Sequence, residues 1–232
     1  MDLDGTRIIV AGATGDFGGS LARALSEAGA ELGLAGRDGD RLGELGGSLD
    51  APTARFEAGD PDGRRTAVDS LAAALGGLDG IVVAIGAPGF APAGAADAAA
   101  ITRLFEVNAL GPIGLIEAAL AHIEPPGAVV GISAIVADHP TAGISHYSAA
   151  KAALSAYLTA LRRERRRDGL AVLDVRPPHM DTAFAERAVF GRAPELPEPL
   201  PVGRVVDAVL HALREDRREI SWDLRARSLV TA

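Results

Sequence analysis

Residues 7–19 read RIIVAGATGDFGG, an apolar run that leads directly into closely spaced glycines. Arg7–Val10 has the length and composition of a short buried strand. Beyond the glycines, apolar residues recur at helical spacing until Gly29 ends the run; they are Leu21, Ala24, Leu25 and Ala28. This segment therefore predicts a strand, a glycine turn and the start of a helix.

Short apolar runs and helix-periodic segments alternate along the rest of the chain. Further strands are expected at Leu32–Ala35, Ala54–Glu57, Ile81–Ile85, Ala128–Ile132, Ala171–Val175 and Glu219–Leu224. Helices are expected at Asp40–Leu45, Arg64–Leu75, Ile101–Asn108, Ile113–His122, Tyr147–Arg167 and Val202–Leu213. The alternation predicts an α/β fold with one Rossmann-like, doubly wound parallel sheet and helices on both faces. Residues 1–232 are expected to form one domain, in which the proline-rich segment 183–201 is a loop that covers a cleft.

Composition excludes several classes of function. The formal net charge of −8 argues against binding to nucleic acid or to an anionic membrane. The chain has no cysteine, and its five histidines show no paired-ligand spacing, so neither a thiolate nucleophile nor a metal site is expected. The amino terminus is acidic, and Gly86, Pro88 and Gly89 interrupt the apolar run that starts at Ile81. We therefore expect a cytoplasmic protein.

The glycines follow the spacing Gly12-x-x-Gly15-x-x-Gly18 between a strand and a helix. Glycine lets the backbone approach a pyrophosphate closely, and the helix amino terminus offers free N–H groups and the positive end of the dipole. Asp16 fits this function only if its carboxylate points away from the phosphates. A glycine turn without a ligand is the structural alternative.

Gly36-Arg37-Asp38 follows the second expected strand. NAD-binding domains commonly place an acid at the tip of this strand, whereas an arginine there accommodates a 2′-phosphate. Arg37 therefore favours NADP(H) over NAD(H), with a solvated surface turn as the alternative.

Lys151 is the only lysine among 23 basic residues, and it follows Tyr147 by four positions. Residues four apart on a helix share a face, which would place the ammonium beside the phenol. A neighbouring cation favours phenolate, so the pair suits proton transfer to and from a carbonyl or alcohol oxygen. A Tyr-x-x-x-Lys spacing also arises in helices where the tyrosine is packing and the lysine is solvated.

Four motifs in order make the chain resemble the short-chain dehydrogenases/reductases over nearly its whole length. They are the glycine turn at Gly12–Gly18, Phe105–Gly111, the segment from Ile132-Ser133 through Tyr147–Ala153, and Arg176–Thr182. The resemblance implies a Rossmann-like domain, a nicotinamide cofactor, a small-molecule carbonyl or alcohol substrate, and a homodimer or homotetramer.

Residue roles follow from the same resemblance. Tyr147 would be the general acid and base, Lys151 would lower the pKa of its phenol and hold the nicotinamide ribose, and Asn108 would position a water in the proton relay. Pro177 and Thr182 would border the nicotinamide. The implied cofactor-binding residues are Gly12, Thr14, Gly15, Asp16, Phe17, Gly18, Arg37, Ala84, Gly86, Tyr147, Lys151, Pro177 and Thr182.

Three positions depart from the motifs of this family. Ala134 stands where the catalytic serine is expected, and Ser133 precedes it. Because side chains alternate along a strand, Ser133 serves that role only if the strand has already ended; otherwise Ser145 or His146 would have to compensate. Val83-Ala84-Ile85-Gly86 replaces a motif rich in asparagine, and Pro178 replaces a glycine.

These motifs support one leading interpretation and two alternatives. The leading one is an NADP(H)-dependent enzyme that interconverts a ketone or aldehyde and an alcohol, with Tyr147, Lys151, Asn108 and Ser133 as its catalytic residues. The first alternative is a weakly active or inactive dinucleotide-binding sensor or scaffold, which Ala134 favours. The second is an isomerase or epimerase that reuses its bound cofactor.

Overall fold

The computed structural model describes residues 1–232 and contains one eight-stranded sheet in the order β3-β2-β1-β4-β5-β6-β7-β8. The strands are β1 (Arg7–Ala11), β2 (Glu31–Gly36), β3 (Thr53–Arg55), β4 (Leu78–Val83), β5 (Ile123–Ile132), β6 (Leu170–Val175), β7 (Glu219–Asp223) and β8 (Ser228–Thr231). All neighbouring strands are parallel except β7 and β8. The predicted Rossmann-like sheet is confirmed.

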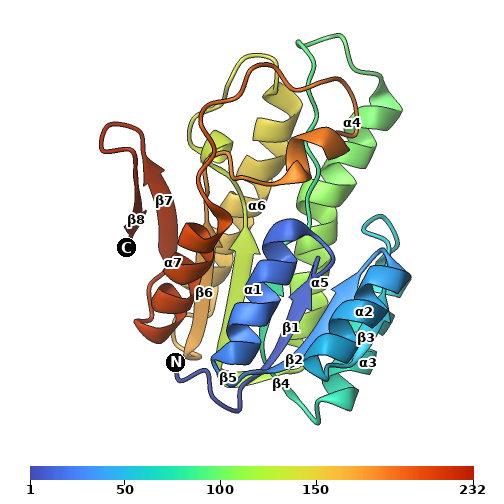
Figure 1. Ribbon diagram of the computed structural model, residues 1–232, viewed down its shortest axis with the longest axis vertical. Helices are drawn as coiled ribbons and strands as arrows, with labels where there is room; N and C mark the ends of the chain where they lie inside the picture. The colour runs from blue at the N-terminus through green and yellow to red at the C-terminus, as the bar shows by residue number, and fades with distance from the viewer.

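The helices cover both faces of the sheet (Figure 1). They are α1 (Asp16–Glu27), α2 (Gly39–Leu49), α3 (Pro61–Ala74), α4 (Ala98–Phe105), α5 (Gly111–Leu120), α6 (Ser145–Glu164) and α7 (Val202–Arg214). One apolar core joins α1, α2 and α7 to one face, and a second joins α3, α5 and α6 to the other. Inward-facing residues of β1, such as Val10 and Ile9, alternate between the two cores, as expected for a strand buried on both faces.

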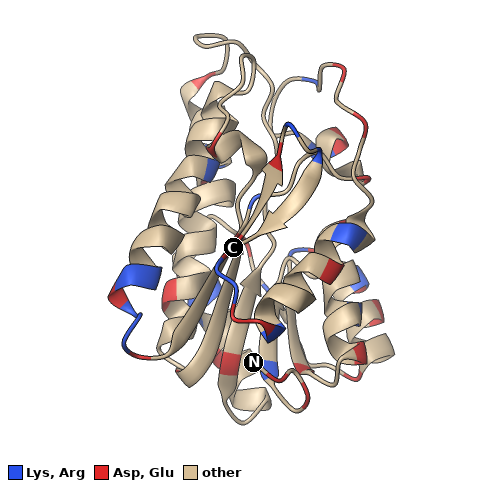
Figure 2. Cartoon of the chain, turned by 90° about the vertical axis from the view of Figure 1, so that its left-hand side faces the viewer, with Lys and Arg blue, Asp and Glu red and all other residues tan.

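The last strand, β8, was not predicted. It pairs with β7 in an antiparallel hairpin, and Asp223 stabilises the turn by accepting hydrogen bonds from the backbone N–H groups of Arg225 and Ala226. Ser228–Thr231 is too short for a clear period, so its strand depends on the exposed edge that β7 offers. Figure 2 shows this hairpin at the edge of the sheet that faces the viewer, with helices on either side, and charged residues scattered over several surfaces of the molecule.

Two predicted helices are joined into one. The expected helices Ile101–Asn108 and Ile113–His122 are continuous through a π-helical turn, η1 (Glu106–Leu110). Single π-turns inside α-helices are frequent at functional sites. Ala98–Leu120 is long and apolar enough to cross a membrane by length and composition alone, and 39% of its apolar 18-residue stretch is buried in this fold. Here α4 packs against α6, and α5 packs against α3.

The carboxyl ends of the parallel strands lie at one end of the molecule, where the segment after β6 crosses (Figure 1). This segment is irregular apart from a short 3-10 helix, η3 (Ala183–Arg187). A second short helix, η2 (Ile135–Ala137), follows β5 at the same end. Irregular backbone is thus concentrated where ligands bind in open parallel sheets.

Candidate active site

A cleft of about 450 Å³ lies at the carboxyl ends of the strands. Its walls contain most of the residues predicted to bind a cofactor: Gly12, Thr14, Gly15, Asp16, Phe17, Gly18, Arg37, Ala84, Gly86 and Thr182. Tyr147, Lys151 and Pro177 do not line it. However, Gly86 connects the cleft to Lys151, because a Cβ atom on Gly86 would lie 3.2 Å from Lys151 Nζ.

The glycine turn leaves no room for side chains. Gly12 has φ +91°, and a Cβ atom there would lie 2.7 Å from the carbonyl oxygen of Ala84. A Cβ atom on Gly18 would collide with the Gly12 carbonyl. Gly15 caps α1 without a side-chain hydrogen bond, so the first N–H groups of the helix have no side-chain partner there. This cradle fits a pyrophosphate.

Asp16 is turned toward the segment after β6. Its Oδ2 accepts hydrogen bonds from the backbone N–H of Ala183 at 3.1 Å and from Arg187 Nη2 at 3.0 Å. The carboxylate therefore faces a cation rather than standing alone beside the expected phosphates. It also ties η3 to the amino terminus of α1.

Arg37, Asp38 and Arg41 line the cleft beyond the tip of β2. Asp38 caps α2, since its Oδ1 accepts from the backbone N–H of Arg41 at 3.1 Å. Arg37 was predicted from the sequence as a cofactor-binding residue, whereas Arg41 was not. The signal for Arg41 was its position in the first turn of the helix that follows Arg37.

Glu57 and Arg103 also line the cleft and were missed. Glu57 follows β3, and Arg103 Nη2 on α4 lies 3.7 Å from its Oε2. Arg103 Nη1 lies 3.4 Å from Glu106 Oε2. The position of Glu57 just after a strand could have indicated a cleft residue, whereas the link to α4 required the tertiary structure.

Tyr147 and Lys151 are buried on one face of α6, as their spacing predicted. Lys151 Nζ lies 6.0 Å from the centroid of the Tyr147 ring. Nζ also donates a hydrogen bond to the Ile132 carbonyl at 2.8 Å, which anchors the ammonium at the end of β5. The two groups are therefore brought together.

Burial shifts the pKa values of both groups. It raises the pKa of the Tyr147 phenol above its ordinary value, which is opposite to the expected lowering by Lys151. The cause is desolvation by the surrounding protein, which disfavours the charged phenolate. Burial also lowers the pKa of Lys151 to about 8, and the negative charge of Asp174 opposes this shift.

Asn108 lies in the π-turn and is fully buried. Its Nδ2 donates to the carbonyls of Ala87 at 2.8 Å and Leu104 at 2.9 Å, and its Oδ1 accepts from the Ala87 N–H at 3.2 Å. A Cβ atom on Gly86 would lie 3.1 Å from this Oδ1. Asn108 therefore fixes the Gly86–Ala87 wall next to Lys151.

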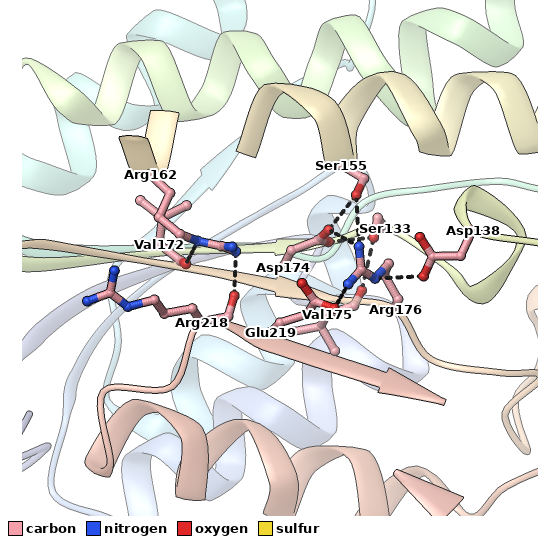
Figure 3. Close-up of polar contacts among 10 residues, drawn as sticks. All are labelled: Ser133, Asp138, Ser155, Arg162, Val172, Asp174, Val175, Arg176, Arg218 and Glu219. Carbon is pink, nitrogen blue, oxygen red and sulfur yellow. Dashed lines mark hydrogen bonds and ion pairs between the residues drawn. The ribbon is translucent and has the colours of Figure 1, made fainter. Parts of the chain in front are cut away.

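Ser133 and Ala134 have different neighbours. Ser133 Oγ is buried and donates a hydrogen bond to Asp174 Oδ1 at 2.5 Å (Figure 3). Ala134 packs instead against Tyr147 and Leu104. Ser133 follows the alternation of β5, because the preceding alternate residue, Gly131, also faces α6 through Leu158. The geometry does not support the catalytic role predicted for Ser133.

Asp174 is the centre of a buried polar network (Figure 3). Its Oδ2 accepts from Ser155 Oγ on α6 at 2.6 Å and lies 3.5 Å from Arg176 Nη1. Arg176 also forms ion pairs with Asp138 and Glu219. The network joins β6, β7, α6 and the segment after β5. The spacing of its residues in the sequence does not predict it.

The remaining predicted positions lie around these groups. Pro177 is buried, and its carbonyl accepts from the Ile135 N–H at 3.0 Å. Thr182 lines the cleft and caps η3. Ser145 is exposed, whereas the Nδ1 atom of His146 is buried without a hydrogen-bond partner. Neither residue is linked to Tyr147 by a hydrogen bond.

Comparison with known proteins agrees with this architecture. Residues 6–190 match the family described as short chain dehydrogenase. An oxidoreductase of Staphylococcus epidermidis is 27% identical over 217 residues, which cover 89% of this chain and 90% of the relative. The match extends over most of both proteins.

Solved structures share the fold. A short chain dehydrogenase from Burkholderia cenocepacia in complex with NADP is 24% identical, with a TM-score of 0.81 and coverage of 92% of each chain. A short chain dehydrogenase/reductase from Burkholderia phymatum in complex with NAD is 17% identical, with a TM-score of 0.86 and coverage of 94% of this chain and 89% of the other.

The chain therefore belongs to the short-chain dehydrogenase family, whose enzymes are oxidoreductases that act on CH–OH and C=O groups. Its glycine cradle and its Tyr147/Lys151 pair are the parts of the structure that suit this class.

Proposed function

We propose that the protein is an NADP(H)-dependent oxidoreductase that interconverts a ketone or aldehyde and an alcohol, with Tyr147 as general acid and base. The observation that carries the proposal is the burial of Tyr147 and Lys151 on one face of α6, beside the glycine-lined cleft. Phe184 makes the connection to the cleft, because it lines the cleft and packs against the Tyr147 ring.

The cofactor would be held by the cradle at Gly12, Gly15 and Gly18, with its phosphates at the amino terminus of α1. Arg37 and Arg41, which line the adjoining part of the cleft, would accommodate a 2′-phosphate. Thr182 and Pro177 would border the nicotinamide. When bound, the nicotinamide would supply or accept the hydride.

The raised pKa of Tyr147 keeps the phenol in the form that carries the proton, although it makes this phenol a weaker acid than free tyrosine. The phenol remains protonated around neutral pH, so it can donate to the oxygen of a carbonyl that is being reduced. The same group would accept the proton in the reverse direction. Lys151, with a pKa of about 8, is mostly protonated at pH 7 and would stabilise the phenolate that forms.

Asn108 would hold a water in the relay that returns a proton to Tyr147. Both N–H groups of its amide are used by backbone carbonyls, and its Oδ1 accepts from only one backbone N–H. The second lone pair of Oδ1 can accept from a water beside Lys151. This is the water-positioning role proposed for Asn108.

Ala134, which packs against Tyr147, carries no hydroxyl, and a hydroxyl donor is worth about 100-fold or more in rate when it stabilises a developing oxyanion. We therefore propose a slow enzyme. The proposal also includes residues 183–201 as a substrate cover within one domain, a homodimer or homotetramer, a cytoplasmic location, and no nucleic-acid or membrane partner.

The chain contains two tyrosines, which provide a matched test. NADPH oxidation should be measured against a panel of ketones and aldehydes in wild type, Tyr147→Phe and Tyr157→Phe. Tyr157 donates to Glu117 Oε1 at 2.6 Å and does not line the cleft. We expect Tyr147→Phe to lose about 100-fold or more of kcat and Tyr157→Phe to keep it.

Equal rates in wild type and Tyr147→Phe would end the proposal. NADPH binding without turnover of any carbonyl would instead point to a dinucleotide sensor. Turnover without net cofactor consumption would point to an isomerase or epimerase.

A further inference from the structure

A cluster of apolar side chains packs around Tyr147, whose ring also has Lys151 Nζ 6.0 Å from its centroid. Leu104 and Ala134 are buried against Tyr147, and the partly buried residues of the same cluster are Val136, Ile144, Phe184, Val189 and Phe190. They come from α4, from the segment between β5 and α6, and from the segment after β6. Three separate parts of the chain thus supply the same kind of surface.

Phe184 covers the reacting end of the site. Its ring centroid lies 6.2 Å from that of Tyr147 with an interplanar angle of 50°. Its ring edge would lie 3.6 Å from a Cβ atom placed on Gly86, on the same side as Lys151 Nζ. A substrate that reaches Tyr147 from the cleft would therefore pass beside Phe184, which lines that cleft and packs against the Tyr147 ring.

Backbone hydrogen bonds hold the rest of this wall. The Val189 N–H donates to the Pro88 carbonyl at 2.8 Å, and the Phe90 N–H donates to the Phe190 carbonyl at 3.0 Å. The Phe190 ring contacts the edge of the His146 ring, with centroids 6.1 Å apart. The apolar surface is therefore a built part of the fold.

Two arginines in the segment after β6 already have acidic partners, whereas the buried Nδ1 of His146, whose ring contacts Phe190, has none. Arg187 is paired with Asp16, and Arg176 is paired with Asp138, Asp174 and Glu219. Lys151 donates to the Ile132 carbonyl and is expected to serve Tyr147. A carboxylate or phosphate on a substrate would lose its hydration at this wall without gaining an ion pair from either arginine.

We infer that the substrate is an uncharged carbonyl compound with an apolar body, recognised by the wall that Phe184, Val189 and Phe190 form beside Tyr147. This inference rests on the proposed function, because it names the substrate class of the same site. Apolar area removed from water supplies the binding energy, while a buried unpaired charge opposes binding.

Matched pairs of substrates test the inference. Each pair differs only by a terminal carboxylate: 2-octanone and 7-oxooctanoate, octanal and 8-oxooctanoate, acetophenone and 4-acetylbenzoate. With NADPH as reductant, we expect kcat/KM for the neutral member of a reactive pair to exceed that of the acid by about 100-fold or more. Equal values, or a preference for the acid, would overturn the inference.

A variant places a cation in the wall. Val189→Arg should shift the neutral-to-acid ratio of kcat/KM toward the acid by about 10-fold or more, because the guanidinium offers the missing partner. The matched control is Val230→Arg, since Val230 lies on β8 with 44% of its surface exposed and does not line the cleft. The ratio should remain at the wild-type value in the control. A ratio unchanged in Val189→Arg would contradict the assignment of the wall.

A binding measurement separates this inference from the proposed function. The ketones can be titrated calorimetrically into the protein with saturating NADP⁺, where no reduction is possible. Binding of neutral ketones without turnover on NADPH would remove the proposed function and keep the ligand class. Tyr147-dependent turnover of the acids alone would keep the proposed function and remove the proposed ligand class. Neither binding nor turnover of any neutral member would overturn both.

Discussion

The hydroxyl of Ser133 donates to the Oδ1 of Asp174 at 2.5 Å, and this bond directs it into a buried network instead of toward Tyr147. Asp174 also accepts from Ser155, so its carboxylate holds two hydroxyl groups below α6. Ala134, the next residue, is the one that packs against the phenol. The missing donor at Tyr147 is therefore a consequence of which of two adjacent residues carries the hydroxyl.

Substitutions at these two positions should have opposite consequences. We expect Ala134→Ser to raise kcat by about 10-fold or more, because it places a hydroxyl beside the phenol. Ser133→Ala should leave kcat nearly unchanged and lower the free energy of unfolding by about 1–3 kcal/mol, since a buried carboxylate loses a donor. Steady-state kinetics and urea unfolding measure both effects. Loss of turnover in Ser133→Ala would restore the catalytic role that the geometry does not support.

The charge of Asp174 should influence the pH profile of the reaction. Burial lowers the pKa of Lys151 to about 8, and Asp174 opposes that shift. Asp174→Asn removes the negative charge, so the pKa of Lys151 should fall further and activity should decline at lower pH than in wild type. Ser155→Ala is the control, because it removes a donor and keeps the charge. Superimposable pH profiles of kcat for wild type and Asp174→Asn would refute this coupling.

Lys151 should also make stability depend on pH. Its pKa is about 8 in the folded protein and 10.5 ordinarily, so the unfolded chain binds more protons between these values and stability rises with pH there. Below pH 8 the buried ammonium is at its most destabilising. The free energy of unfolding of Lys151→Met minus that of wild type should therefore be about 2 kcal/mol larger at pH 7.0 than at pH 9.5. Urea unfolding at both pH values checks this, and a difference that does not change with pH would contradict it.

Arg37 should set the cofactor preference. Arg37→Ala is expected to raise the KM for NADPH by about 10- to 100-fold and to leave the KM for NADH unchanged, because only NADPH carries the 2′-phosphate. Arg65→Ala, on the exposed side of α3 and outside the cleft, should change neither value. Initial rates with both cofactors make the comparison. Equal effects on the KM values for NADPH and NADH would mean that Arg37 does not bind the 2′-phosphate.

Asp16 should hold the segment after β6 in place. Asp16→Ala removes the acceptor of both Ala183 and Arg187, so limited proteolysis within residues 183–201 should become several-fold faster. Asp62→Ala is a matched control, because Asp62 is also an acid in the first turn of a helix but does not contact this segment. Equal cleavage rates in the two variants would show that the contact does not restrain the segment.

The local pattern of residues was enough for much of this structure. Strand and helix periods predicted the alternation of β1 through β7 with helices, because each element buries an apolar face whose period is visible in the chain. Gly12, Gly15 and Gly18 predicted the cradle, since a Cβ atom on Gly12 or Gly18 would clash with nearby backbone. The spacing of Tyr147 and Lys151 predicted a shared face, because four residues are about one helical turn.

Contacts between distant segments decided the rest. The side on which Ser133 points depends on Asp174 across the sheet, and the strand β8 depends on the edge of β7. The pKa of Tyr147 was expected to fall and instead rises, because desolvation by packed neighbours is a property of the folded protein and not of a spacing. The sequence by itself determined which chemical groups are available and in which element each one lies. Only the tertiary structure decided which of them meet and how far they are shielded from water.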